Sequence, residues 1–202
     1  LALEGVRRLM DYQDHGYAAE YLDRLAGVHA LDDGAGEWRL TRETARCLAA
    51  WMAYEDIIRV ADLKIRATRS LRVRTEAGLS QGQLLTVTEY MHPRLQEVCE
   101  TMPARFGEAI LASARLRRWL EPLFARGRHV ETTSLRWFLA LRACAALRPL
   151  RRRTLRHRCE DGRIEAWLAF VREAARRDPA FAVEAVLAQQ LVKGYSDTFE
   201  RG

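Results

Sequence analysis

Residues 40–77 read LTRETARCLAAWMAYEDIIRVADLKIRATRSLRVRTEA, a long segment without proline or glycine. Thr41 is suited to cap its first turn, and Gly78 follows its last. Apolar side chains cover most of the circumference between Tyr54 and Ile65, a pattern typical of a buried helix. The segment therefore predicts an all-α fold. We expect a single multi-helix domain organised around one long central helix over about residues 41–77.

Charged residues follow one face of this predicted helix. Glu55 and Arg59 are spaced i,i+4, as are Asp62 and Arg66, while Asp56 stands three residues before Arg59. Two interpretations are open. The charges form either a solvated ladder worth about 0.3–0.5 kcal/mol per pair, or a buried ion network or polar docking surface in which every charge needs a partner.

Length and composition limit the class of protein. The chain has 202 residues, 49% of them hydrophobic, which suffices for one domain with a real core. Its apolar runs fall short of the ~18 residues that a membrane span needs. Its four cysteines are scattered without a C-x-x-C motif, so free thiols are expected. We expect a soluble cytoplasmic protein.

The positive charge is concentrated in one region. Residues 113–158 contain thirteen arginines and two glutamates, a net charge of +11, within a chain whose formal charge is +6. Codon usage in a GC-rich genome is the favoured explanation of such arginine enrichment, and a selected anion-binding surface is the alternative. Eight of these arginines could neutralise phosphates: Arg115, Arg117, Arg118, Arg151, Arg152, Arg153, Arg156 and Arg158.

Other segments give local predictions. Asp14 is suited to cap a helix that carries Tyr17 and Tyr21 on its apolar face. Residues 84–90 are enriched in β-branched residues but isolated, so we expect an extended segment or a helical turn rather than a sheet. Asp178 before Pro179 predicts the start of a last helix, over residues 179–192.

Motifs for catalysis are missing from the sequence. A thiamine diphosphate site needs an Asn downstream of a Gly-Asp-Gly motif, and the chain has no Asn. The sequence contains no phosphate-binding loop or dinucleotide glycine motif, and the five histidines lack metal-ligand spacing. We therefore predict no catalytic centre, cofactor site or metal site in this chain.

Four segments in order resemble the helical region of the beta subunit of the indolepyruvate oxidoreductase (indolepyruvate:ferredoxin oxidoreductase) family. They are DYQDHGYAAEYLDRL (11–25), LTRETARCLAAWMAYEDIIRVADLKIRATR (40–69), LLTVTEYMHPRLQEV (84–98) and KGYSDTFERG (193–202). The chain also begins without an initiator Met. We therefore expect residues 1–202 to be one helical domain excised from a longer subunit, which also carries a pyruvate/ketoisovalerate oxidoreductase gamma-type domain.

The resemblance implies a parent enzyme that oxidatively decarboxylates aryl pyruvates, while this fragment is not itself an enzyme. Thiamine diphosphate, magnesium and iron–sulfur clusters would belong to other domains of the parent complex. The implied partners are the gamma-type domain, the thiamine- and cluster-binding alpha subunit and, for the complex, ferredoxin. We expect no membrane partner and disfavour nucleic acid. The role would be structural or subunit-docking; the alternative is a free-standing basic helical module binding an anionic partner such as nucleic acid.

The candidate residues for a polar network or docking surface lie in three places. On the central helix and after it they are Glu55, Asp56, Arg59, Asp62, Lys64 and His92, and near the end of the chain they are Lys193, Tyr195, Asp197 and Thr198. The last four combine a helix end with an Asx-type turn, so a purely structural role is an equal interpretation there. His92 precedes a proline, as residues at the start of a helix often do.

Overall fold

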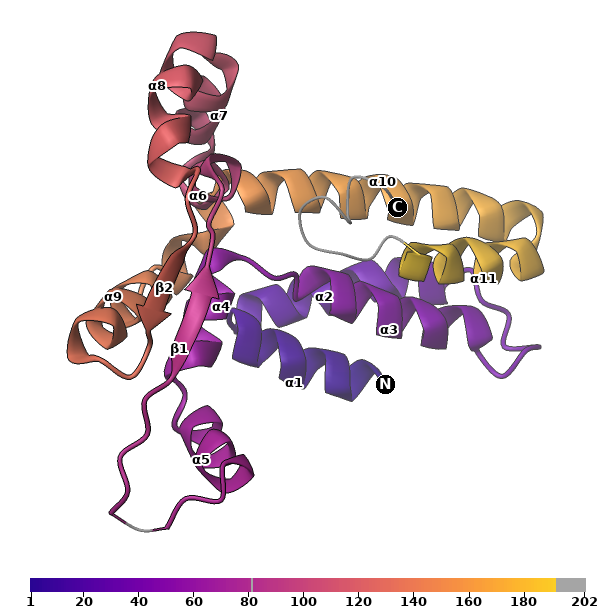
Figure 1. Ribbon diagram of the computed structural model, residues 1–202. Coiled ribbons are helices and arrows are strands. Elements are labelled where there is room, and N and C mark those ends of the chain that lie inside the picture. The colour runs from indigo at the N-terminus through magenta and orange to yellow at the C-terminus, as the bar shows by residue number, and fades with distance from the viewer. Residues whose placement is uncertain (81, 192–202) are drawn as a thin grey trace. The chain divides into compact units, whose positions relative to one another are not determined.

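The computed structural model describes residues 1–80 and 82–191 (Figure 1). The prediction of an all-α fold is confirmed, since helices predominate over one small sheet. The elements are α1 (Ala2–Tyr12), α2 (His15–His29), α3 (Arg39–Met52), α4 (Ile57–Ile65), α5 (Ala67–Glu76), β1 (Thr88–Met91), α6 (Leu95–Thr101), α7 (Ala104–Ala112), α8 (Ala114–Phe124), β2 (Arg128–Glu131), α9 (Leu135–Ala145), η1 (Arg148–Arg153), α10 (Leu155–Arg177), α11 (Pro179–Ala188) and η2 (Gln189–Leu191).

The prediction of one continuous central helix is wrong. Residues 41–77 form parts of three helices, α3, α4 and α5, separated at residues 53–56 and at Arg66. Asp56 lies in extended backbone, with φ −131° and ψ 171°, and its side chain caps α4 by accepting a hydrogen bond from the Arg59 backbone N–H at 2.6 Å. Arg66 is also extended, with φ −68° and ψ 134°. Neither break requires glycine or proline.

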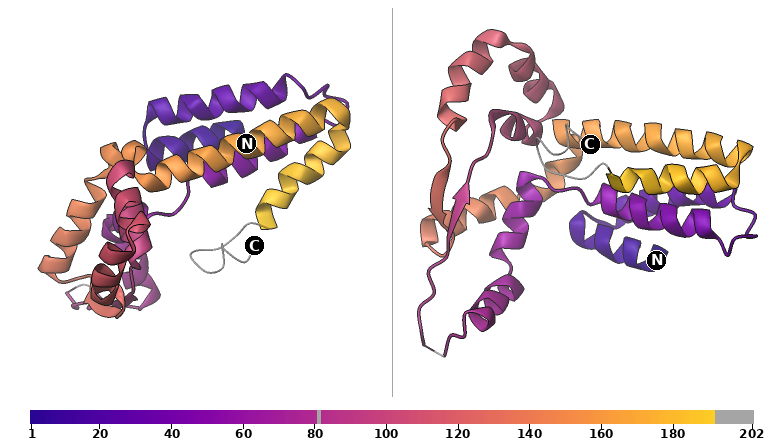
Figure 2. Two further views of the ribbon diagram at one scale, coloured as in Figure 1. Left: turned by 90° about the horizontal axis from the view of Figure 1, so that it is seen from above. Right: turned by 45° about the vertical axis from the view of Figure 1, so that its right-hand side comes forward.

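The chain divides into two compact units. The first comprises Leu1–Glu55 and the described residues from Cys159 onward, and the second comprises Asp56–Arg158. In the first unit α1, α2 and α3 pack on one another, and α11 packs on α3 (Figure 2). This unit holds the main hydrophobic core. The chain passes from the first unit into the second between residues 55 and 56, and it returns to the first unit within α10.

Two tyrosines of α2 are buried in the core of the first unit, and their hydroxyl groups make hydrogen bonds there. Tyr17 donates to the Met52 carbonyl at 3.0 Å, and Tyr21 donates to the Ala45 carbonyl at 3.1 Å. Burial raises the pKa of Tyr21 to about 12. Gly5 of α1 lies against the Tyr21 ring, where an added Cβ would stand 2.6 Å from it. The predicted aromatic face of α2 is therefore core.

The small sheet lies in the second unit and corrects the interpretation of residues 84–90. β1 pairs with β2 antiparallel, with Thr88 opposite Glu131 and Met91 opposite Arg128. The partner strand is forty residues away in the sequence. Local composition therefore identified one extended strand but could not identify its partner.

Capping explains where several helices begin. Asp14 accepts a hydrogen bond from the Tyr17 N–H at 2.8 Å, and Asp178 caps α11, as predicted. Thr41 does not begin a helix, because α3 starts at Arg39. Instead Asp32 accepts hydrogen bonds from the Thr41 N–H and hydroxyl at 2.8 and 2.7 Å. Partial burial would raise the pKa of Asp32, but these bonds leave it lowered.

A glycine substitution in the second unit tests its packing, and a glycine substitution in the first unit serves as the comparison. Gly107 of α7 is buried, and a Cβ added there would stand 2.4 Å from the Cys99 carbonyl oxygen. Because a backbone carbonyl group in a packed helix cannot move aside without a cost in free energy, we expect Gly107→Ala to lower the free energy of unfolding by about 1–3 kcal/mol. Gly162 of α10 meets nothing within 4 Å, so Gly162→Ala should raise it by about 0.5–1 kcal/mol.

Urea melts of the two variants and the unsubstituted chain measure both effects. Equal stabilities for the Gly107→Ala and Gly162→Ala chains would contradict the close packing of α7 on α6.

Candidate functional site

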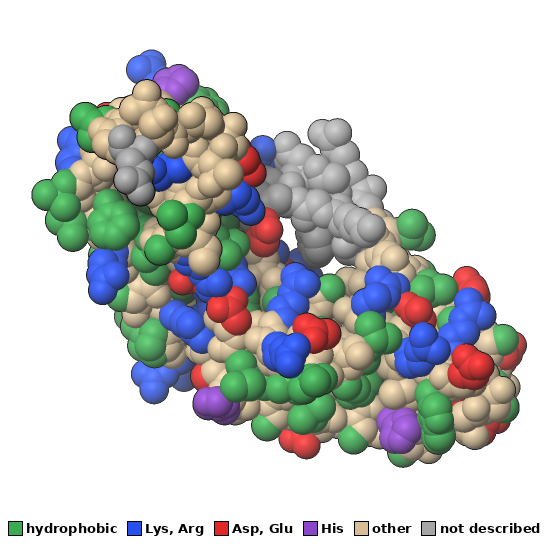
Figure 3. Space-filling model, turned by 90° about the horizontal axis from the view of Figure 1, so that it is seen from below, with side chains coloured by type: hydrophobic (Ala, Val, Ile, Leu, Met, Phe, Trp, Pro, Cys, Tyr) green, Lys and Arg blue, Asp and Glu red, His purple; other side chains and the backbone are tan. Residues whose placement is uncertain are grey.

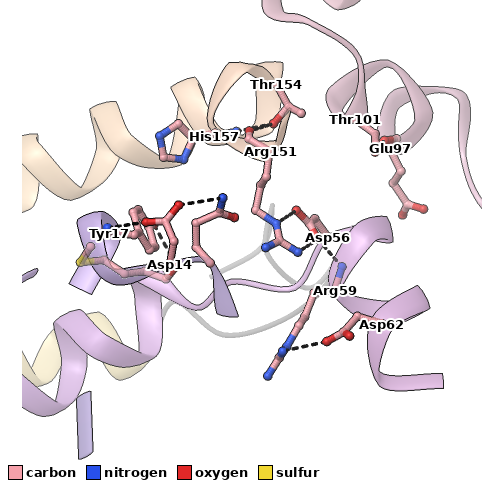
Figure 4. Close-up of polar contacts among 12 residues, drawn as sticks. Asp14, Tyr17, Asp56, Arg59, Asp62, Glu97, Thr101, Arg151, Thr154 and His157 are labelled. Carbon is pink, nitrogen blue, oxygen red and sulfur yellow. Dashed lines mark hydrogen bonds and ion pairs between the residues drawn. The ribbon is translucent and has the colours of Figure 1, made fainter. Parts of the chain in front are cut away.

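The most buried polar cluster of the second unit is an ion pair between Arg151 of η1 and Asp56 (Figure 4). Arg151 Nε lies 2.8 Å from Asp56 Oδ2, and Arg151 Nη2 lies 3.3 Å from Asp56 Oδ1. The two side chains are only 2% and 6% exposed. Since both carboxylate oxygens accept hydrogen bonds, the pair is built to hold η1 against the start of α4.

A second pairing lies on α4 and just beyond it. Asp62 accepts hydrogen bonds from Arg59 at 3.1 Å (Figure 4) and from Arg66 at 2.5 Å. The three side chains are between 15% and 30% exposed, so they are neither a solvated ladder nor a sealed network. The predicted i,i+4 pair of Asp62 and Arg66 is confirmed. Glu55 is exposed.

Lys64 and Arg69 converge on one carboxylate. Both pair with Glu89 of β1, Arg69 Nη2 at 2.6 Å. Partial burial, followed by the neighbouring charge of Arg69, lowers the pKa of Lys64. The predicted candidate Lys64 therefore ties α4 to the sheet.

His92 completes the end of a helix. Its Nε2 atom lies 3.1 Å from the carbonyl oxygen of Phe124, the last residue of α8. Helix ends leave carbonyls without partners inside the helix, and a donated ring N–H satisfies one of them. The four remaining candidates, Lys193, Tyr195, Asp197 and Thr198, lie outside the described residues.

One buried acid was not among the predicted residues. Glu160 of α10 has a side chain 2% exposed. It accepts hydrogen bonds from Trp51 Nε1 at 2.8 Å and from Arg163 Nη1 at 3.1 Å. Nothing in the local sequence indicates this contact, because Trp51 and Glu160 stand 109 residues apart. The contact joins α3 to α10 inside the first unit.

Ion pairs also occupy part of the basic run that follows α9. Arg156 Nη1 lies 3.1 Å from Glu100, and Arg158 pairs with Glu108. Together with Arg151, three arginines considered as phosphate ligands are engaged by carboxylates of the same unit. The run is therefore partly a structural feature.

The cysteines do not gather. Cys47 and Cys99 are buried, Cys144 is half-buried and Cys159 is exposed. Burial raises the thiol pKa of Cys47, Cys99 and Cys144. Within residues 1–80 and 82–191, no three His, Cys, Asp or Glu residues are grouped so that they could hold a metal ion.

Fold and polar contacts define an all-helical protein whose internal charges brace its helices. The chain belongs to a family of unknown function, DUF6537, whose family model matches residues 1–202. A search of curated proteins and a search of solved structures each found no match. In the described part of the chain, no helix combines the length and hydrophobicity needed to cross a membrane.

Removal of the Arg151 side chain should strongly destabilise the fold, because it leaves the Asp56 carboxylate buried without its partner. We expect Arg151→Ala to lower the free energy of unfolding by about 3–5 kcal/mol in urea melts. The matched control is Arg153→Ala, an exposed residue of the same run, which should change it by less than about 0.5 kcal/mol.

The double variant Arg151→Met with Asp56→Asn keeps the cap of α4 and removes both charges. It should lose less stability than Arg151→Ala alone. Similar losses of stability for Arg151→Ala and Arg153→Ala would show that the pair of Arg151 and Asp56 does not stabilise the second unit.

Thiol reactivity should distinguish Cys159 from the other cysteines. The thiolate is the reactive form, and burial both shields the other three thiols and raises their pKa. A thiol-specific reagent at neutral pH should modify one cysteine quickly in the folded chain and all four in urea. Cys159→Ser should abolish the fast phase, and a fast phase that survives this substitution would contradict the assignment.

Proposed function

We propose that the chain is a non-catalytic helical module of a 2-oxoacid:ferredoxin oxidoreductase subunit, with a structural or subunit-docking role in the cytoplasm. The parent enzyme would oxidise aryl pyruvates such as indolepyruvate. The proposal starts from the ordered resemblance of four segments, and the contacts of the candidate residues support it.

One observation carries the structural role. Asp56, Arg59, Asp62, Lys64 and His92 each make at least one polar contact with a group of the second unit itself. A catalytic or ligand-binding set would instead converge on a common space with atoms left to bind a substrate. These residues join helix to helix and helix to sheet, as expected for a module that must keep its shape while it holds other domains.

The segments that carry the resemblance also build the core. Tyr17 and Tyr21 come from the first of them, and the carbonyls that they bind, Met52 and Ala45, come from the second. A resemblance carried by core residues favours a shared fold rather than shared chemistry. It therefore favours a module over an active site.

Part of the surface of the second unit is suited to contact another protein. Its exposed apolar side chains are numerous and large; they include Leu71, Leu84, Phe106, Trp119, Leu123, Leu135 and Leu139. Figure 3 shows hydrophobic side chains beside Lys and Arg on the surface of this unit. Where such side chains are contiguous, they mark an interaction site.

The cofactors of the parent complex belong to other domains in this proposal. The iron–sulfur clusters are placed in those domains because a cluster takes several thiolates from one site, and the four cysteines of this chain are scattered in sequence without a C-x-x-C motif. Thiamine diphosphate, magnesium and the electron transfer to ferredoxin are assigned to the alpha subunit.

The alternative, a free-standing module that binds nucleic acid, has less support. Arg151, Arg156 and Arg158 are engaged by carboxylates, which reduces the phosphate-binding set. Binding to nucleic acid would fall steeply with salt.

Association with the catalytic subunits tests the proposal. We expect the chain to co-sediment with a purified complex of the gamma-type domain and the thiamine- and cluster-binding subunit at 0.15 M salt. The chain alone should give no oxidation of indolepyruvate, and the assembled enzyme should reduce ferredoxin. Absence of a complex in sedimentation velocity, at low as well as at physiological salt, would refute the docking role.

A further inference from the structure

Helix α8 presents an unpartnered apolar face. Leu116, Trp119 and Leu123 recur at i, i+3 and i+7 and so form one stripe along the helix. They are 42%, 73% and 59% exposed. No residue of α8 is buried. We call these three residues the α8 stripe.

The inner edge of the helix is distinct from this stripe. Leu120 and Phe124 are half-buried, and α8 contacts α6 and α7. At 100° per residue, Leu120 and Phe124 lie on one side of the stripe, and Arg115 and Arg118 lie on the other. The stripe is thus bounded by packed residues on one side and by two cations on the other.

The two arginines differ from the arginines of the basic run. Arg115 and Arg118 are exposed, and among residues 1–80 and 82–191 neither has an ion-pair partner. Arg156 and Arg158, by contrast, pair with glutamates of their own unit. The cations beside the stripe therefore have their full charge available to a partner.

The pattern fits a helix that docks in a groove. An amphipathic helix binds by placing residues spaced i, i+3 and i+7 in an apolar groove, and opposite charges at the rim set orientation and partner choice. Trp and Arg are the side chains that most often dominate such interfaces. Trp119 stands at the centre of the stripe, with Arg115 and Arg118 at its edge.

We propose that the α8 stripe docks in an apolar groove of a partner protein whose rim carries carboxylates facing Arg115 and Arg118. This inference rests on the proposed function, since it takes the catalytic body of the oxidoreductase as that partner. Charge complementarity selects the partner: two α8 surfaces facing each other would bring like charges together. A membrane surface is a poorer match, because membrane affinity scales with buried apolar area and the stripe offers three side chains.

The test uses the full chain and the purified complex of the gamma-type domain with the thiamine- and cluster-binding subunit. One variant combines Trp119→Ser with Leu123→Ser, and a second combines Arg115→Glu with Arg118→Glu. The matched control combines Leu3→Ser with Arg8→Glu, two exposed residues of α1. Urea melts should show that all four chains are equally stable, since every substituted position is exposed.

The stripe variant should raise the Kd measured by titration calorimetry by about 30-fold or more, as loss of a central interface anchor does. The charge-reversal variant should raise it by about 10-fold at 0.15 M salt and by less at 1 M salt, because salt screens the rim charges. The control should bind like the unsubstituted chain.

The outcomes separate the two proposals. If the unsubstituted chain binds and both α8 variants bind equally well, the docking role stands and the α8 stripe is not its contact. If the unsubstituted chain does not bind, both proposals fail. Vesicles of phosphatidylglycerol with phosphatidylcholine, a 20-nucleotide RNA and sedimentation of the chain alone complete the test. The inference is overturned if the unsubstituted chain binds vesicles or RNA, or self-associates, without binding the complex, and the α8 variants lose that binding. The α8 stripe would then be the contact for that other partner.

Discussion

The burial of one ion pair constrains much of the second unit. A charge removed from water is tolerated only when a partner and further hydrogen bonds compensate it, and Asp56 obtains both from Arg151 and the backbone of α4. To reach them Asp56 must adopt extended backbone. The chain therefore cannot continue as a helix from α3 into α4, and the boundary between the two compact units falls at residues 55–56.

The same need to satisfy polar groups recurs at helix ends. The carbonyls of Met52 and Phe124, the last residues of α3 and α8, accept hydrogen bonds from Tyr17 and His92 respectively. Each contact satisfies a group that a helix end leaves without a partner, and each ties that end to a different segment. These polar side chains thus hold separate segments of the chain together. A structural role is therefore sufficient to explain the contact of His92.

Interactions between residues close in sequence could be predicted, whereas interactions between distant residues could not. The caps at Asp14 and Asp178 were predicted because each capping residue and the N–H groups that donate to it lie two or three residues apart. The break before α4 was missed because a segment without glycine or proline can still leave the helical conformation. Here Asp56 adopts extended backbone, caps α4 and pairs with Arg151, 95 positions away. Among the candidate residues, the local pair of Asp62 and Arg66 was predicted, but the attachment of Lys64 to Glu89 was not.

Arginine content alone cannot separate codon usage from selection, but environment can. Arg151 uses Nε and Nη2 on one buried carboxylate, a fork that lysine lacks, so its identity as arginine is explained by geometry. Among the described residues, Arg115 and Arg118 make no such fork. What distinguishes them is position, since both border exposed apolar residues on one helix. The arrangement of charge around Trp119 therefore marks α8 as a contact surface, whatever codon bias filled those positions.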